Sequence, residues 1–197
     1  MPIEIRLLHS KDAGYAPDLG RVLLECVRAG ASVSFMADLT EADATVFYQG
    51  VFDAMARGER LLLAAFDGSD IVGTVQLHTK MPPNQPHRAD VAKLLVRPAA
   101  RGRGIGEQLM RAVEESAARE GKTLLVLDTA TGESGERLYA RLGWSRVGEI
   151  PNFALFPDGR SCATTIFYKA LKSSAPSSPP RPSPPREGAR SGNPRRA

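Results

Sequence analysis

The sequence predicts an α/β fold, in which a mixed sheet with an antiparallel first half carries helices on both faces. Segments of strand-like and helix-like periodicity follow in the order strand, two helices, three strands, helix, strand, helix, two strands. Residues 123–127 form a continuous apolar run, which is typical of a strand buried on both faces. The length of 197 residues suits one core, and 42% hydrophobic with 24% charged residues are ordinary proportions for a soluble globular protein.

The first elements have recognisable ends. A strand is expected at residues 3–8 and a helix at residues 19–29. Thr40 and Asp43 have the spacing of a capping box, in which each side chain bonds the backbone N–H of the other residue. A second helix is therefore expected to begin there and to end at Gly58, since glycine readily adopts the left-handed conformation that closes helices.

A hairpin and a further strand come next. Strands at residues 60–66 and 71–79 flank Asp67-Gly68-Ser69-Asp70, where the glycine can supply the positive φ of a tight turn. After a polar loop, a strand is expected at residues 89–96. Pro98 ends this strand, because proline cannot donate to a central ladder.

The second half alternates helices and strands. A helix that begins near Gly104 and ends at Gly121 has one apolar face, formed by Ile105, Leu109, Val113 and Ala117. The remaining elements are expected as a strand at 123–127, a helix at 133–142 and strands at 145–150 and 162–168.

The last 25 residues differ from the rest in composition. Residues 173–197 hold seven of the 15 prolines and no large apolar side chain, so we expect a disordered tail after a folded domain at residues 1–172. The tail is either a docking segment or a solvated extension. Its five arginines and one glutamate account for the net charge of +4, and the domain is neutral. A neutral domain argues against a nucleic-acid partner.

The sequence disfavours an oxidising compartment, a metal site, a signal peptide and a membrane partner. Cys26 and Cys162 lie far apart and have no CxxC or metal-ligand spacing, which favours a reducing, cytoplasmic compartment. His9, His78 and His87 are not paired with other ligands at a suitable spacing, so no metal site is expected. The chain has neither a basic start with an apolar run nor about 18 consecutive apolar residues, so we expect no signal peptide and no membrane partner.

Residues 94–106 combine a strand end, a glycine-bearing turn and a helix start. Gly102, Gly104 and Gly106 let backbone N–H groups converge, and the helix N-terminus adds its positive dipole end, so the turn suits a pyrophosphate. It lacks the Lys-Ser/Thr of a P-loop and the glycine order of a dinucleotide fold. The alternative is that the glycines serve only a tight turn and close helix packing.

The motif Arg101-x-x-Gly104-x-Gly106 resembles the (Gln/Arg)-x-x-Gly-x-(Gly/Ala) acetyl-CoA motif of GNAT acetyltransferases. The resemblance implies a central, mostly antiparallel sheet that is splayed at one parallel strand pair, with acetyl-CoA as cosubstrate. It implies backbone contacts to the pantetheine arm and acetyl group from Leu94, Leu95 and Val96. The other cofactor-binding residues that it implies are Arg101, Gly102, Arg103, Gly104, Ile105, Gly106 and Glu107.

Residues 136–144 resemble the family's helix of form x-x-Leu-Tyr-x-x-x-Gly-Phe, in which the tyrosine, here Tyr139, lies near the coenzyme sulfur. A phenol within hydrogen-bond reach can protonate a departing thiolate. The alternative for Tyr139 is plain helix packing beside Leu142 and Trp144. Many family members have Asn seven residues before the tyrosine, where this sequence has Gly132.

Further segments narrow the resemblance: residues 30–39, 99–106, 127–129, 146–151 and 157–160. They are similar to the tabtoxin-resistance acetyltransferases, GNAT enzymes that acetylate a β-lactam toxin. This similarity implies Asp128 as general base and Tyr139 as general acid. A carboxylate at the open end of a buried strand suits a base, because we expect it to be partly desolvated there. The alternative is that Asp128 only ends the strand and caps the following turn.

The loop at residues 30–39 is expected to form the acceptor-side wall, since the first helices of this family cover the cleft opposite the coenzyme. Phe35 and Met36 are candidates for substrate binding, and their alternative role is hydrophobic closure over the core. We predict direct acetyl transfer to a small-molecule acceptor. The resemblance implies an amino-acid-like or β-lactam compound as one such acceptor. Cys26 and Cys162 are expected away from the cleft, so no covalent enzyme intermediate is predicted. A non-catalytic acetyl-CoA sensor and an enzyme that acts on a protein or another amine stay open.

Overall fold

The computed structural model describes residues 2–172, so the tail predicted at residues 173–197 lies outside the described residues. The strands are β1 (Ile3–Leu8), β2 (Arg60–Asp67), β3 (Asp70–His78), β4 (Arg88–Val96), β5 (Leu124–Ala130), β6 (Ser145–Leu155) and β7 (Ser161–Ala170). The α-helices are α1 (Ala16–Arg28), α2 (Glu41–Ala56), α3 (Ile105–Arg119) and α4 (Ser134–Arg141), and the 3-10 helices are η1 (Ser10–Tyr15) and η2 (Pro98–Ala100).

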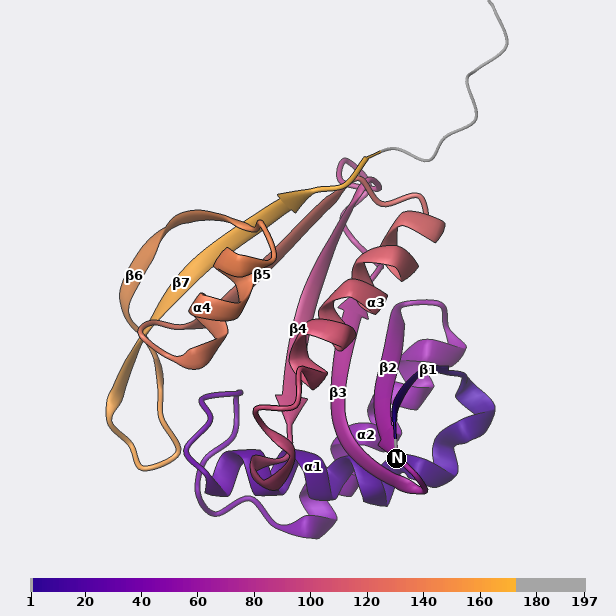
Figure 1. The fold of residues 1–197 in the computed structure, drawn as a ribbon, viewed down its shortest axis with the longest axis vertical. Coiled ribbons are helices and arrows are strands. Elements are labelled where there is room, and N and C mark those ends of the chain that lie inside the picture. Colours follow the sequence, from indigo (N-terminus) through magenta and orange to yellow (C-terminus); the bar gives the residue numbers. More distant parts are fainter. Residues whose placement is uncertain (1, 173–197) are drawn as a thin grey trace, which may run out of the picture.

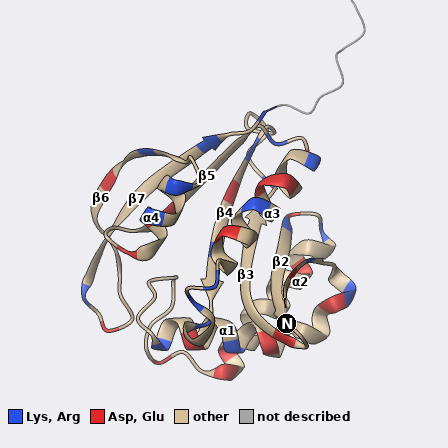
Figure 2. Ribbon diagram, viewed as in Figure 1, with Lys and Arg blue, Asp and Glu red and all other residues tan. Residues whose placement is uncertain are grey.

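The strands form one seven-stranded sheet in the order β1-β2-β3-β4-β5-β7-β6 (Figure 1). Neighbouring strands are antiparallel except for β4 and β5, which run parallel. The prediction of a mixed, mostly antiparallel sheet with one parallel pair and surrounding helices is therefore confirmed. Basic and acidic residues are interspersed over the described elements (Figure 2), as expected for a neutral domain.

Capping and turn residues in the sequence predicted most helix and strand ends correctly. The capping box is present at α2, where Thr40 Oγ1 accepts a hydrogen bond from the Asp43 N–H at 3.1 Å and Asp43 Oδ2 accepts one from the Thr40 N–H at 3.3 Å. Helix α1 begins at Ala16 rather than residue 19, because Pro17 in its first turn has the fixed φ that a helix start favours. Strands β5 and β6 extend beyond the predicted ends at residues 127 and 150, since both pair with β7.

The core has two parts, one on each face of the sheet. Leu63 packs in the cluster between the sheet and α3, and the adjacent Leu62 packs in the cluster under α1 and α2. This division follows from the strand geometry, since successive side chains point to opposite faces. No helix within residues 2–172 is long and apolar enough to span a membrane.

Helix α3 packs closely on β3 at Gly73. A Cβ atom built there would lie 2.9 Å from the Leu95 carbonyl oxygen and 3.2 Å from Leu109 Cδ1. We expect Gly73→Ala to lower the free energy of unfolding by about 1–3 kcal/mol, because backbone and core must shift to make room. Urea denaturation would measure this change. Gly50→Ala is the matched control: Gly50 lies in α2 with no atom within 4 Å of the added Cβ, so it should raise stability by about 0.5–1 kcal/mol. An equal response at both sites would contradict the packing argument.

The parallel strand pair separates after a short ladder. β4 and β5 are paired only at Arg88 with Leu124, Ala89 with Leu125, and Asp90 with Val126. Beyond this point β4 stays paired with β3, and β5 stays paired with β7. The two halves of the sheet therefore diverge (Figure 1), which opens a gap between the carboxyl ends of β4 and β5.

Candidate active site

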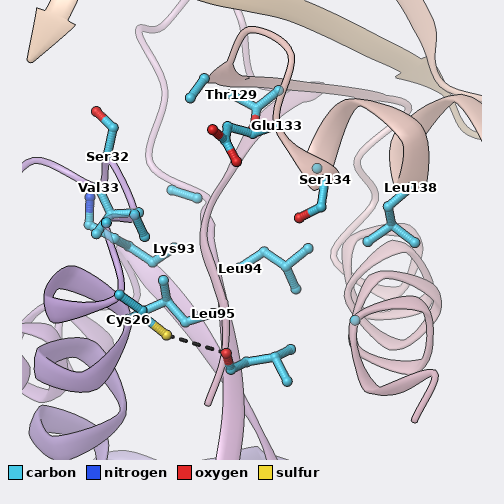
Figure 3. Close-up of a pocket in the computed structure, with 18 of the residues that line it drawn as sticks. Cys26, Ser32, Val33, Lys93, Leu94, Leu95, Thr129, Glu133, Ser134 and Leu138 are labelled. Atoms are coloured by element: carbon cyan, nitrogen blue, oxygen red, sulfur yellow. Dashed lines mark hydrogen bonds between the residues drawn. The ribbon is translucent and has the colours of Figure 1, made fainter. Parts of the chain in front are cut away.

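A pocket of about 1090 Å³ lies where β4 and β5 separate. Its wall is built from β4, β5, the start of α3, one side of α4, the loop after α1 and the β6–β7 hairpin. Figure 3 shows Leu94 of β4 between the α1 side of the pocket, with Ser32 and Val33, and the α4 side, with Ser134 and Leu138. Every predicted site residue lines this pocket except Arg103. The Arg103 guanidinium instead pairs with Asp67, at 2.6 Å.

The turn before α3 lines the pocket with the backbone of a helix start. Gly102 and Gly104 have φ of 79° and 74°, a left-handed conformation that glycine adopts without a Cβ clash. The Gln108 N–H bonds the Gly104 carbonyl at 3.1 Å, so the N–H groups of Ile105 and Gly106 precede the first intrahelical bond. These donors and the positive helix end form a site that fits a pyrophosphate.

Strand β4 contains a β-bulge that was not predicted from the sequence. Thr74 of β3 faces Leu95 and Gln76 faces Ala92, so two residues of β4 oppose one residue of β3. Lys93 lies in the bulge with φ of 53°. A non-glycine residue in this region costs about 1–3 kcal/mol, and such strain is concentrated at functional sites. No glycine or proline marks the bulge, so local sequence carried no signal for it.

Asp128 lies inside β5 rather than after its end, which corrects the expected boundary. Its register partner is Ile166 of β7, and its side chain is exposed to the pocket rather than partly desolvated. Asp128 Oδ2 accepts a hydrogen bond from the buried Thr164 hydroxyl at 2.8 Å, which fixes the carboxylate. Asp90 of β4 pairs with Arg88 at 3.1 Å and does not line the pocket.

Tyr139 of α4 both packs in the core and lines the pocket. Its ring centroid lies 6.0 Å from that of Trp144 and 5.7 Å from that of Phe167, and its side chain is 6% exposed. Burial, and to a smaller extent the charge of Asp128, raise the pKa of the Tyr139 phenol above its ordinary value. The phenol is therefore protonated at neutral pH and can donate a proton to an anion that forms beside it.

The loop after α1 closes one end of the pocket together with the β6–β7 hairpin. Ser32 Oγ donates to the Leu155 carbonyl at 2.8 Å, and the Ala37 N–H donates to the Pro157 carbonyl at 3.1 Å. Phe35 packs edge-on against Phe47 at 5.2 Å, whereas Met36 is 40% exposed; both line the pocket. The sequence did not predict that the hairpin is part of the site, because β6 was expected to end at residue 150, before these residues.

The two cysteines lie in the pocket wall, which corrects their expected position away from the cleft. Both are buried and have free thiols. Cys26 Sγ donates to the Val96 carbonyl at 3.4 Å, and burial raises the pKa of the Cys26 thiol. A protonated, buried thiol is a poor nucleophile, so Cys26 acts here as a packing residue.

Among residues 2–172, no group of three or more His, Cys, Asp and Glu side chains is placed to hold a metal ion.

The splayed strands, the helix-start turn and the pocket agree with a known family. The model of the acetyltransferase (GNAT) family matches residues 27–144, which is more than half of the chain. The chain belongs to this family. The matched region contains the turn before α3 and ends at Trp144, directly after α4.

Individual relatives of this GNAT chain share a minority of its residues, or match it over only part of their own length. N-acetyltransferase 8B of Rattus norvegicus is 36% identical over 87 residues, which are 43% of this chain and only 39% of the rat protein. The structure of yncA from Salmonella typhimurium with acetyl-CoA has a TM-score of 0.73 and 17% identity, covering 90% of this chain and 99% of that chain. Ribosomal-protein-alanine N-acetyltransferase from Brucella melitensis has a TM-score of 0.70 and 20% identity, covering 85% and 99%. At these identities the solved structures share the fold.

Proposed function

We propose that this GNAT chain transfers the acetyl group of acetyl-CoA directly to the amine of a small-molecule acceptor. One observation carries the proposal. A single pocket brings together the helix-start turn before α3, the Asp128 carboxylate of β5 and the Tyr139 phenol of α4, which are an anion site, a base and an acid. Family membership and neighbours such as yncA, whose structure was solved with acetyl-CoA, support the choice of acetyl donor.

Each group has a defined role in this proposal. Acetyl-CoA supplies an activated thioester when bound. The N–H groups before the first intrahelical bond of α3 hold its pyrophosphate, and backbone N–H groups of β4 beyond Asp90, where the ladder with β5 ends, donate to the thioester oxygen. Asp128 accepts a proton from the acceptor amine as the nitrogen–carbon bond forms. Tyr139 gives a proton to the sulfur as the carbon–sulfur bond breaks.

The proposed acceptor is a small molecule, with an amino-acid-like or β-lactam compound as the specific candidate. The loop at residues 30–39 is hydrogen-bonded to the β6–β7 hairpin through Ser32 and Ala37. These two segments wall one end of the pocket, which we call the acceptor end because the acceptor would bind there. A walled pocket suits a compact acceptor better than an extended peptide. The segments that resemble tabtoxin-resistance enzymes include this loop and residues 157–160 of the hairpin.

The free thiols of Cys26 and Cys162 support a reducing, cytoplasmic location.

Two measurements test the function. Calorimetry should detect binding of acetyl-CoA or CoA to the purified chain. Thiol release from acetyl-CoA should be measured with a panel of amines that includes amino acids, β-lactam amino acids and peptides. Binding with no thiol release for any amine would favour a non-catalytic sensor. Turnover of peptides alone would favour a protein acceptor.

Gly104→Val should weaken CoA binding by about 10-fold to 100-fold. A β-branched residue cannot keep φ at 74°, so the turn shifts and its charge-assisted hydrogen bonds to the pyrophosphate are lost. Calorimetric titration with CoA measures the change. Gly121→Val is the matched control, because Gly121 has φ of 72° directly beyond the other end of α3 and does not line the pocket. Both variants should lose similar stability; equal CoA affinity in the two would contradict the assignment of the turn.

A further inference from the structure

A cation lines the pocket on the side away from α4. Lys93 is half-buried, and its Nζ donates to Ser34 Oγ at 3.1 Å and lies 5.9 Å from the ring centroid of Phe35. In Figure 3 Lys93 lies beside Ser32 and Val33 on the α1 side of the pocket. The same loop contains Phe35 and Met36, which also line the pocket. The ammonium group therefore lies beside the loop at residues 30–39, which was expected to form the acceptor-side wall.

The bond between Lys93 and Ser34 joins two strained residues. Within residues 2–172, the non-glycine residues with positive φ are Ser34 (75°), Lys93 (53°) and Asn152 (55°). Two of these three come from distant parts of the chain and meet at the pocket wall through one hydrogen bond. Backbone strain persists where the surroundings fix it, and it is concentrated at ligand sites. The hydrogen bond between these two residues places an ammonium and a hydroxyl side by side at the pocket wall.

The charge of Lys93 has no ion-pair partner in the described part of the chain, whereas two nearby arginines each have one. Arg160 at the same end of the pocket pairs with Asp158 at 2.7 Å, and Arg97 at the end of β4 pairs with Glu25. Burial lowers the pKa of the Lys93 ammonium, and the charge of Asp128 partly opposes this effect. A half-buried cation bonded only to a neutral hydroxyl is costly, and an anion bound beside it would compensate.

We propose that Lys93 Nζ and Ser34 Oγ bind a carboxylate of the acceptor, so that the substrates are amino compounds carrying a carboxylate. This inference rests on the proposed acetyl transfer and specifies its acceptor class. Ser34 accepts from Lys93 through its oxygen and can give its own proton to the carboxylate. Asp128 on β5 and Lys93 on β4 lie on opposite sides of the strand gap, so an acceptor that spans it places its ammonium at Asp128 and its carboxylate at Lys93.

A purely structural role for Lys93 makes a different prediction. If Lys93 only ties the loop at residues 30–39 to β4, its loss should weaken the use of every acceptor by the same factor. If it binds a carboxylate, its loss should change the preference between a carboxylate and an uncharged analogue of the same shape. The preference ratio therefore separates the two roles.

The test compares α-amino acids and β-lactam amino acids with their carboxamides, as acceptors in thiol release and as ligands of the CoA-bound chain in calorimetry. The wild-type chain should prefer the carboxylate by about 10-fold to 100-fold in kcat/KM, mainly through KM, as expected for one charge-assisted hydrogen-bond site. Lys93→Met should abolish this preference, and Lys93→Arg should restore most of it. Lys11→Met, which removes an exposed lysine outside the pocket, is the control and should keep the preference.

The outcomes separate the inference from the proposed function. If the wild-type chain binds no CoA, the proposed function fails. If CoA binds and the carboxylates and carboxamides are bound or used equally, or neither is bound, the inference about Lys93 is overturned and the coenzyme site stands. A Lys93→Met variant that loses all acceptors equally while CoA affinity is retained would assign Lys93 to loop anchoring and likewise overturn the inference.

Discussion

Asp128→Asn should lower kcat for acetyl transfer by about 10²-fold to 10⁴-fold, the usual contribution of a positioned general base. Asparagine has nearly the same size and keeps an oxygen that can accept the hydrogen bond from Thr164, which is 2.8 Å in the wild-type chain. The Asp128 side chain is exposed to the pocket, so the substitution should leave the fold intact. Thiol release at saturating acetyl-CoA and acceptor measures kcat, and calorimetry should show unchanged CoA affinity.

The pH dependence gives the Asp128→Asn experiment a second readout. Raising the pH increases the fraction of acceptor amine that is already neutral, so the variant should recover part of its rate at high pH. Asp53→Asn is the matched control, since Asp53 is exposed on α2 and does not line the pocket. It should retain the wild-type rate. Full activity of Asp128→Asn at every pH would show that another group accepts the proton.

The parts of the fold that were predictable depend on residues near one another in the sequence. Thr40 and Asp43 lie three positions apart, so their capping box was visible as a spacing and is present in the structure. The apolar face of α3 was equally local, and Ile105 and Leu109 are both buried in the core. The glycines before α3 carried the family signal, and every predicted pocket residue except Arg103 lines the pocket.

The parts that were not predictable depend on pairing between distant segments. The bulge at Lys93 arises from the register between β3 and β4, which alternation within one strand cannot reveal. β5 continues past Leu127 because β7 pairs with it as far as Ala130, and this pairing places Asp128 inside the strand. The β6–β7 hairpin reaches the acceptor end through bonds to the loop after α1. Its contribution therefore required the three-dimensional structure.

Tyr139→Phe should lower kcat by about 10²-fold to 10⁴-fold at neutral pH, because the departing sulfur loses its proton donor. Stability should change by no more than about 0.5 kcal/mol. The ring keeps its contacts with Trp144 and Phe167, and no group within residues 2–172 is hydrogen-bonded to the Tyr139 hydroxyl. Tyr168→Phe is the control, since Tyr168 is 41% exposed on β7 and does not line the pocket; it should retain the wild-type rate.

The raised pKa of Tyr139 fixes the sign of the pH effect in the wild-type chain. Burial and the charge of Asp128 disfavour the phenolate, so the phenol keeps its proton above pH 10.0, the ordinary pKa of tyrosine. The wild-type kcat should therefore show no loss from tyrosine ionisation up to pH 10.0. A fall in kcat below that pH that is absent from Tyr139→Phe would show that the phenol ionises earlier than its environment requires. Unchanged kcat in Tyr139→Phe would instead show that Tyr139 is only a core residue that closes the pocket.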